Sequence, residues 1–281
     1  MSETVVVDVH VIGGISIRVY RSTGQSAAPI GVLFLLHGRH GSANDVDSMA
    51  KSIHEHGTKK SRLDLFIVTL DHRNHGNRIV ESVANNTWTE EKNNVKHALD
   101  MYSIQRGTAQ DVSFLIDFMQ SYLFPMNERR IEAWGIAGIS LGGHSTWIAL
   151  AQDARITVGI PIIGCPDYEA LMEYRANTSN IPFEPPYIPS GFSDAIKSSN
   201  PASGDYTSLK NTNPFLGKKI LVLSGQDDKL VPWTASKGFV ELLEVGEEGL
   251  KEVVVQKGVG HECTKEMVER TAGFVEAELL K

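Results

Sequence analysis

The sequence predicts an α/β fold, in which a mostly parallel central sheet carries helices on both of its faces. Three observations lead to this prediction. Unbroken apolar runs recur along the chain, as in strands that are buried on both faces. Segments with the period of an amphipathic helix separate these runs. The first two strands instead alternate apolar and polar residues, which is typical of an antiparallel hairpin.

The predicted elements follow in order along the chain. Alternation over residues 4–11 and 15–20, split by Gly13-Gly14, predicts the hairpin. Buried strands are predicted at 32–36, 65–70, 131–137, 157–162 and 220–223. Helices are predicted at 45–56, 108–122, 141–152 and 234–243. A last strand at 252–256 precedes a last helix over about 264–280.

Two segments interrupt this order. Residues from about 84 to 106 form a polar, Asn-rich stretch with Trp88, and residues from about 165 to 214 carry most of the prolines. Loops of this length are usually lids over a functional site or disordered linkers. Aromatic and proline content with little net charge favours an ordered cap. We therefore expect one domain over residues 1–281, with lid-forming insertions at about 84–106 and 165–214.

Composition limits the classes of partner. The chain has 281 residues, 41% of them hydrophobic, and a formal net charge of −7. This negative balance, without a basic stripe, argues against a nucleic-acid partner. The sequence contains no segment typical of a signal peptide or a membrane-spanning helix. Two cysteines, Cys165 and Cys263, favour a reduced, cytoplasmic compartment. We expect a small-molecule substrate; monomer and homodimer both stay open.

The most informative motif is Gly138-Ile139-Ser140-Leu141-Gly142, between an apolar run and a segment able to form a helix. A strand, a sharp turn that presents a serine, and a helix form the context in which G-x-S-x-G carries a nucleophile. The two glycines allow close approach of neighbouring backbone while Ser140 takes a strained conformation. Leu141 begins the helix, so its N–H faces charge that develops beside the serine.

A serine nucleophile needs a base, and the base needs an acidic partner. In this fold class the chain order is serine, acid, histidine. Only His144 and His261 follow Ser140, and His144 is one helical turn away with no room for an acid-bearing strand between. The base is therefore His261. The acid is Asp227 or Asp228, because both follow a strongly apolar run, and the residues alone leave this choice open.

With these residues in place, the chain resembles the α/β-hydrolase superfamily, in particular its esterase, dienelactone-hydrolase and prolyl-oligopeptidase-like members. The family's G-x-x-D-x-x-V-P stretch matches residues 225–232, and the resemblance selects Asp228 as the acid. A glycine-rich loop that ends in histidine matches residues 258–261. The resemblance implies an α/β-hydrolase fold and a triad of Ser140, Asp228 and His261.

The same resemblance suggests an oxyanion hole. The His37-Gly38-Arg39 turn is similar to the family's His-Gly turn, which pairs the backbone N–H of Arg39 with that of Leu141. We expect His37 to hold this loop by hydrogen bonding. No cofactor and no metal are expected, because H-x-x-H at 37–40 and at 72–75 lacks a third ligand at a diagnostic spacing.

These features predict a serine hydrolase that cleaves a carboxylic ester through an acyl-enzyme. The alternatives are a peptidase or amidase, a thioesterase, and a ligand-binding protein without turnover on the same fold. Aromatic residues of the two insertions are the candidates for the substrate pocket, namely Trp88, Phe183, Tyr187 and Phe192.

Overall fold

The computed structural model describes residues 4–24, 26–56, 61–89 and 94–281. The strands are Val5–Ile12 (β1), Ile15–Ser22 (β2), Ile30–Leu36 (β3), Asp64–Leu70 (β4), Ile131–Ile139 (β5), Ile156–Ile162 (β6), Lys219–Gly225 (β7) and Leu250–Gln256 (β8). The α-helices are Asp47–His56 (α1), His97–Leu123 (α2), Leu141–Gln152 (α3), Tyr168–Thr178 (α4), Ser190–Lys197 (α5), Trp233–Leu242 (α6) and Lys265–Glu278 (α7). Short 3-10 turns are Gly76–Arg78 (η1), Ser82–Asn85 (η2) and Pro201–Ser203 (η3).

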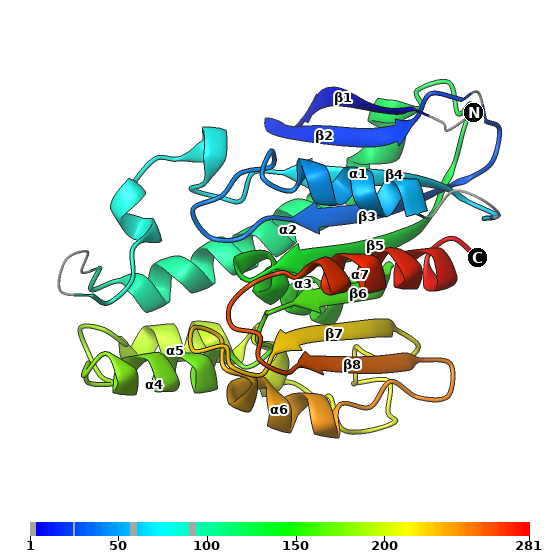
Figure 1. Ribbon diagram of the computed structural model, residues 1–281. Helices are drawn as coiled ribbons and strands as arrows, with labels where there is room; N and C mark the ends of the chain where they lie inside the picture. The colour runs from blue at the N-terminus through cyan, green and yellow to red at the C-terminus, as the bar shows by residue number, and fades with distance from the viewer. Residues whose placement is uncertain (1–3, 25, 57–60, 90–93) are drawn as a thin grey trace.

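All of these strands join one sheet in the order β1-β2-β4-β3-β5-β6-β7-β8 (Figure 1). β1 pairs with β2, and β2 with β4, in antiparallel fashion. The remaining neighbours, from β4 through β3 to β8, are parallel. The observed architecture confirms the predicted fold class. Parallel strands end at a common edge, so the loops after β3, β5, β7 and β8 meet there.

Helices cover the sheet on both faces. Val32, Phe34 and Leu36 of β3 belong to the core on the side of α2, α3 and α6. Leu33 and Leu35 belong to the core on the side of α1 and α7, which lie in front of the sheet in Figure 1. Alternate residues of one strand thus enter different cores, as the pleat requires. This two-sided burial explains why the strand is apolar throughout.

Helix α2 differs from its prediction, because it begins at His97 and not at residue 108. It therefore occupies the second half of the stretch 84–106, of which residues 90–93 lie outside the described residues. Its first turns bury His97, Gln105 and Tyr102 together with apolar side chains. A helix that buries polar groups on several sides lacks a simple apolar stripe, so its period is weak in the sequence.

The segment 165–214 lies between β6 and β7 and contains α4, α5 and η3. It packs on the start of α2. The hydroxyl of Tyr168 donates to the carbonyl of Ala98 at 2.6 Å, and the hydroxyl oxygens of Tyr102 and Ser199 lie 2.9 Å apart. The segment is therefore an ordered cap at the edge of the sheet where the parallel strands end (Figure 1). Its action as a lid stays a prediction.

A search of the helices in the described part of the chain found none with the length and apolar character needed to cross a bilayer.

Candidate active site

Ser140 occupies the sharp turn between β5 and α3. Its backbone angles are φ 54° and ψ −107°, a conformation that costs energy for any residue with a side chain. Glycines make the turn possible. A Cβ on Gly138 would lie 2.3 Å from the backbone of Gly142, and one on Gly142 would lie 2.6 Å from the carbonyl oxygen of Leu36. The tight turn projects the serine beyond the end of the sheet.

Three side chains from distant parts of the chain meet at this turn. The Oγ of Ser140 lies 2.8 Å from Nε2 of His261, and Nδ1 of His261 lies 2.7 Å from Oδ2 of Asp228. Because a carboxylate only accepts, Nδ1 of the neutral ring carries the hydrogen. The lone pair on Nε2 then faces the serine hydroxyl. This geometry is suited to removing the hydroxyl proton.

Asp228 follows β7 and is 3% exposed, whereas its neighbour Asp227 is exposed. Its second oxygen, Oδ1, accepts from the amides of Leu230 at 2.8 Å and Val231 at 2.9 Å. Burial alone would raise the pKa of Asp228, but the hydrogen bonds from His261 and these amides outweigh burial and lower that pKa. The group next to the imidazole is therefore an ionised carboxylate at neutral pH.

His261 lies in the loop after β8, with its side chain 23% exposed. This loop passes close to the end of β7. A Cβ on Gly225 would lie 2.4 Å from the carbonyl oxygen of Gly260. The absence of a side chain at Gly225 thus lets the histidine loop come within reach of Asp228.

The turn after β3 faces the same serine. Within the described residues, the backbone N–H groups of Arg39 and Leu141 donate to no acceptor, and both residues line the pocket beside Ser140. Unpaired N–H groups at the start of a helix and in a neighbouring turn are suited to holding an oxyanion.

His37 fixes that turn. Its Nδ1 donates to the carbonyl of Gly38 at 2.7 Å, and its Nε2 accepts from the amide of His72 at 3.1 Å. The ring of His72 lies 2.9 Å from the carbonyl oxygen of His37. Burial lowers the pKa of His37 to about 4, so the ring is neutral. Both ring nitrogens are used in hydrogen bonds.

The pocket beside Ser140 is small, with a volume of about 20 Å³, which is room for about one water molecule. Apart from Ser140 and Leu141, its lining consists of Arg39, Met101, Gln105, His144, Arg175 and Leu230. Side chains of this pocket therefore come from the turn after β3, from α2, α3 and the cap helix α4, and from the loop after β7.

The four aromatic candidates from the sequence lie elsewhere. Trp88 is 3% exposed and packs edge-on against His97 and Tyr187. Phe192 is buried against Tyr102 and Tyr168. Phe183 is exposed on the cap. The structure brings together Ser140, Asp228, His261, Arg39 and Leu141, and it brings none of these aromatic residues to the lining of that pocket.

The sequence analysis missed Gln105, His144, Arg175, Met101 and Leu230 as pocket residues. Arg175 and Gln105 belong to segments that were expected to be loops, and single polar residues there carry no motif. His144 was considered as a base, but not as part of the lining. Within the described residues, no cluster of three or more histidine, cysteine, aspartate or glutamate side chains has the arrangement of a metal site.

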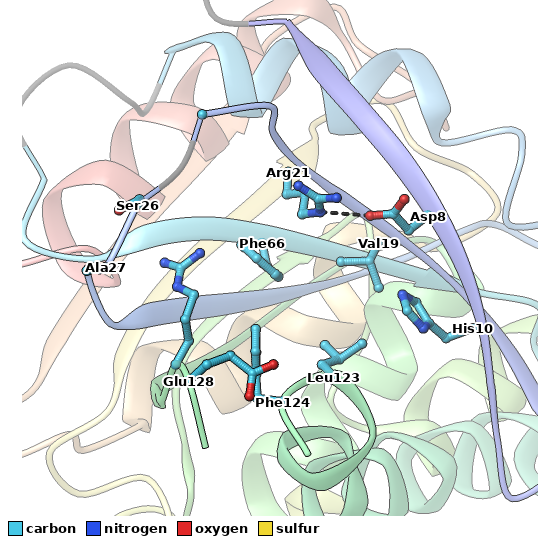
Figure 2. Close-up of a pocket in the computed structure, with 12 residues that line it drawn as sticks. Asp8, His10, Val19, Arg21, Ser26, Ala27, Phe66, Leu123, Phe124 and Glu128 are labelled. Atoms are coloured by element: carbon cyan, nitrogen blue, oxygen red, sulfur yellow. Dashed lines mark hydrogen bonds and ion pairs between the residues drawn. The ribbon is translucent and has the colours of Figure 1, made fainter. Parts of the chain in front are cut away.

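A larger pocket of about 720 Å³ lies at the opposite edge of the sheet, where β3 and β5 begin (Figure 2). Its two arginines are paired with carboxylates. Arg21 donates to Asp8 at 2.7 Å, and Arg129 contacts Asp64 at 2.5 Å while it lies over the ring of Phe66. This pocket contains no residue of the Ser140 site.

The fold and the site define the chain as a serine hydrolase of the α/β-hydrolase superfamily. It belongs to the prolyl oligopeptidase family, which it matches over residues 105–277, more than half of the chain. No curated protein matches the chain at a significant level.

Solved structures share the fold at low identity. TT1662 from Thermus thermophilus has a TM-score of 0.69 at 18% identity, over 99% of each chain. The esterase Pf2001 of Pyrococcus furiosus has a TM-score of 0.56 at 17% identity, over 98% of this chain and 93% of that one. An acylaminoacyl peptidase of Pyrococcus horikoshii has a TM-score of 0.58 at 16% identity, and the match spans all of this chain but 42% of that one.

Proposed function

We propose that this chain hydrolyses carboxylic esters through an acyl-enzyme on Ser140, with His261 as the base and Asp228 as its partner. One observation carries the proposal: the continuous hydrogen-bonded path from Ser140 through His261 to Asp228, with distances of 2.8 Å and 2.7 Å. The esterases among the similar structures support it, since Pf2001 matches over nearly its whole length.

In the first half of the reaction, Oγ of Ser140 attacks the ester carbonyl carbon while Nε2 of His261 takes the hydroxyl proton. The carbonyl oxygen becomes an oxyanion, held by the N–H groups of Arg39 and Leu141. The bond to the leaving alkoxide then breaks, and the imidazolium gives this alkoxide its proton. Asp228 stabilises the imidazolium throughout by its negative charge.

In the second half, His261 takes a proton from water, and the hydroxide formed attacks the acyl carbon. The second tetrahedral intermediate uses the same two N–H groups. Its collapse releases the carboxylic acid, and the proton on His261 returns to Oγ of Ser140. The enzyme is regenerated, and one water molecule is consumed for each ester cleaved.

A peptidase is the second candidate, because the family match and the acylaminoacyl peptidases among the similar structures favour it. An amide nitrogen is a poorer leaving group than an alkoxide, so peptide cleavage needs tighter positioning of the substrate. Comparison of kcat/KM for p-nitrophenyl butyrate and alanine p-nitroanilide separates the two. A larger value for the anilide would overturn the ester assignment and leave the nucleophile unchanged.

The test of the nucleophile is covalent labelling with a fluorophosphonate. We expect the intact chain to be labelled at Ser140 and Ser140→Ala not to be, with kcat for p-nitrophenyl butyrate falling by a factor of about 10⁴ or more. Ser121→Ala is the matched control, because Ser121 is exposed on α2 at the far end from the site. Undiminished labelling of a folded Ser140→Ala variant would remove the proposal.

A further inference from the structure

Two guanidinium groups line the pocket beside Ser140, and neither has an acidic partner. Arg39 comes from the turn after β3, and Arg175 from the cap helix α4. Every ion pair within the described residues joins other groups. Two like charges in one small pocket repel each other, and they are an arrangement that a bound anion would stabilise.

Arg39 carries the clearest sign of a missing partner. Its Nη1 is buried and donates to no acceptor in the described part of the chain. A buried donor without an acceptor is costly in a folded protein and is rare unless a ligand satisfies it. Burial lowers the pKa of Arg39, but a guanidinium stays protonated at neutral pH.

Arg175 is held in place before any substrate arrives. Its Nε and Nη2 donate to the carbonyl of Leu230 at 3.3 Å and 3.2 Å. Its Nη1 lies 3.4 Å from Nε2 of His97, whose Nδ1 donates to the carbonyl of Asn86 at 2.8 Å. Burial, with a contribution from Arg175, lowers the pKa of His97 to about 3, so this ring is a neutral acceptor.

Two neutral donors complete the lining. Gln105 is 2% exposed, and it lines the pocket with a side-chain amide that can donate. His144 is 3% exposed, and its Nδ1 lies 2.9 Å from the amide nitrogen of Cys165 and 3.2 Å from the carbonyl oxygen of the same residue. The shorter contact makes Nδ1 the acceptor, which places the hydrogen of the neutral ring on Nε2. Burial lowers the pKa of His144 to about 3, which keeps the ring neutral.

We propose that this pocket binds a carboxylate on the acyl part of the substrate, so that the preferred substrates are half-esters of short dicarboxylic acids. The inference rests on the proposed function. The acyl side is favoured because the pocket contains Ser140 and Leu141 but not His261, which protonates the leaving group. The pocket as it stands holds about one water molecule, so its lining side chains must move apart to admit the acyl group, and this favours a short chain. Met101 and Leu230 offer the methylene groups of that chain apolar contact.

The test compares charged and neutral esters of equal size. The probes are the monoethyl esters of malonic, succinic and glutaric acid, each against the same ester with a carboxamide in place of its carboxylate. Ethanol release gives kcat/KM for each. We expect at least one half-ester to exceed its carboxamide partner by about tenfold or more, as charge-assisted hydrogen bonds permit. The inference is wrong if no half-ester exceeds its partner.

Variants then assign the preference to the two arginines. In Arg39→Gln and Arg175→Gln the ratio of kcat/KM between half-ester and carboxamide should fall by roughly 10- to 100-fold. Arg175→Lys keeps the charge and should retain part of the ratio. Arg62→Gln, at an exposed arginine paired with Glu132, is the matched control and should leave the ratio unchanged. If Arg175 only supports the loop at Leu230, Arg175→Gln lowers kcat/KM for the half-ester and for its carboxamide partner by the same factor. The inference then fails for Arg175.

A further arm places the carboxylate on the other side of the ester. 3-Acetoxypropanoate carries it on the leaving group, and a preference for this ester over the half-esters would overturn the acyl-side placement. Failure of the inference is distinct from failure of the proposed function. Fluorophosphonate labelling of Ser140 with hydrolysis of the carboxamide esters, but no preference for charge, would remove the carboxylate site alone.

Discussion

At the scale of single residues, the site depends on which nitrogen of His261 carries the hydrogen. Asp228 accepts from Nδ1 and thereby leaves a lone pair on Nε2 for the serine proton. An amide at this position can donate to Nδ1 instead, which places the hydrogen on Nε2. The imidazole is then unable to act as a base.

Substitution of the two adjacent aspartates tests this. We expect Asp228→Asn to lower kcat for p-nitrophenyl butyrate by about 10⁴, the size of effect that a wrong tautomer produces in a triad. Asp227→Asn is the matched control, because Asp227 is exposed, and its kcat should stay within about twofold of the unmodified chain. Equal losses in the two variants would show that loop geometry, and not the tautomer, is responsible.

Some residues of the site could be predicted from the sequence and others could not. The candidates Ser140 and His261 followed from a motif and from chain order, since both depend on spacing along the chain. The choice between Asp227 and Asp228 came from the family resemblance, because neighbouring residues in a loop differ only in direction. The place of Arg175 at the pocket could not be predicted from the sequence. Its place at the pocket depends on how the cap folds over α2, and one arginine in a polar segment predicts nothing.

At the scale of elements, the turn at Ser140 depends on Gly138 and Gly142, because neighbouring atoms leave no room for a side chain at either position. The atoms that a Cβ would meet at Gly138 and Gly142 belong to backbone, which cannot move aside as the end of a flexible side chain can. Gly273 in α7 is different. A Cβ there meets nothing within 4 Å, so the glycine only weakens its helix.

Alanine substitutions at these glycines should therefore have opposite effects. Gly142→Ala is expected to lower the free energy of unfolding by about 1 to 3 kcal/mol, the usual cost of forced overpacking, and to reduce labelling of Ser140. Gly273→Ala should raise the free energy of unfolding by about 0.5 to 1 kcal/mol and leave the labelling of Ser140 unchanged. Urea denaturation measures both. Destabilisation by both variants alike would mean that the close approach at Gly142 does not govern the turn.

Strands were easier to predict than helices in this chain. A parallel strand covered on both faces is apolar throughout, so the sequence shows β3 as an unbroken apolar run. The start of α2 was missed because buried polar groups such as His97 and Gln105 break its apolar period. Helices α4 and α5 lie in a proline-rich segment. Prolines nearby in the sequence argue against a helix, so short helices that tertiary packing stabilises are not predicted there.

At the scale of the molecule, the two edges of the sheet differ in how their charges are matched. At the edge where β3 and β5 begin, arginines pair with Asp8 and Asp64. At the edge where they end, Arg73 and Arg78 also pair with Asp111, but Arg39 and Arg175 have no acidic partner among the described residues. Topology brings Ser140, His261 and Asp228 to this second edge, and the cap adds the positive charge of Arg175 beside them.

Several histidines lie at this edge, where β3 and β5 end, and they are neutral because they are buried. Burial lowers the pKa of His37 to about 4, and the pKa values of His97 and His144 to about 3, from an unfolded value of 6.5. Each of these groups binds a proton in the unfolded chain at a pH at which it stays unprotonated in the fold. Their contribution to stability is thus complete above pH 6.5 and is lost as pH falls toward the folded pKa values.

The free energy of unfolding should therefore fall steeply as pH falls below about 6, which is above the range in which carboxylates titrate. His37, His97 and His144 alone give a slope of about 4 kcal/mol in the free energy of unfolding per pH unit below pH 6, and almost none between pH 7 and 8. His72 and His75, whose pKa values burial also lowers, add to this slope. Urea denaturation at pH 8, 7, 6 and 5 measures this. His97→Gln should reduce the slope by about 1.4 kcal/mol per pH unit, because one proton fewer is taken up on unfolding. Equal denaturation midpoints at pH 7 and pH 5 would contradict the assignment of these histidines as neutral, and with it the tautomers assigned to His97 and His144 in the carboxylate pocket.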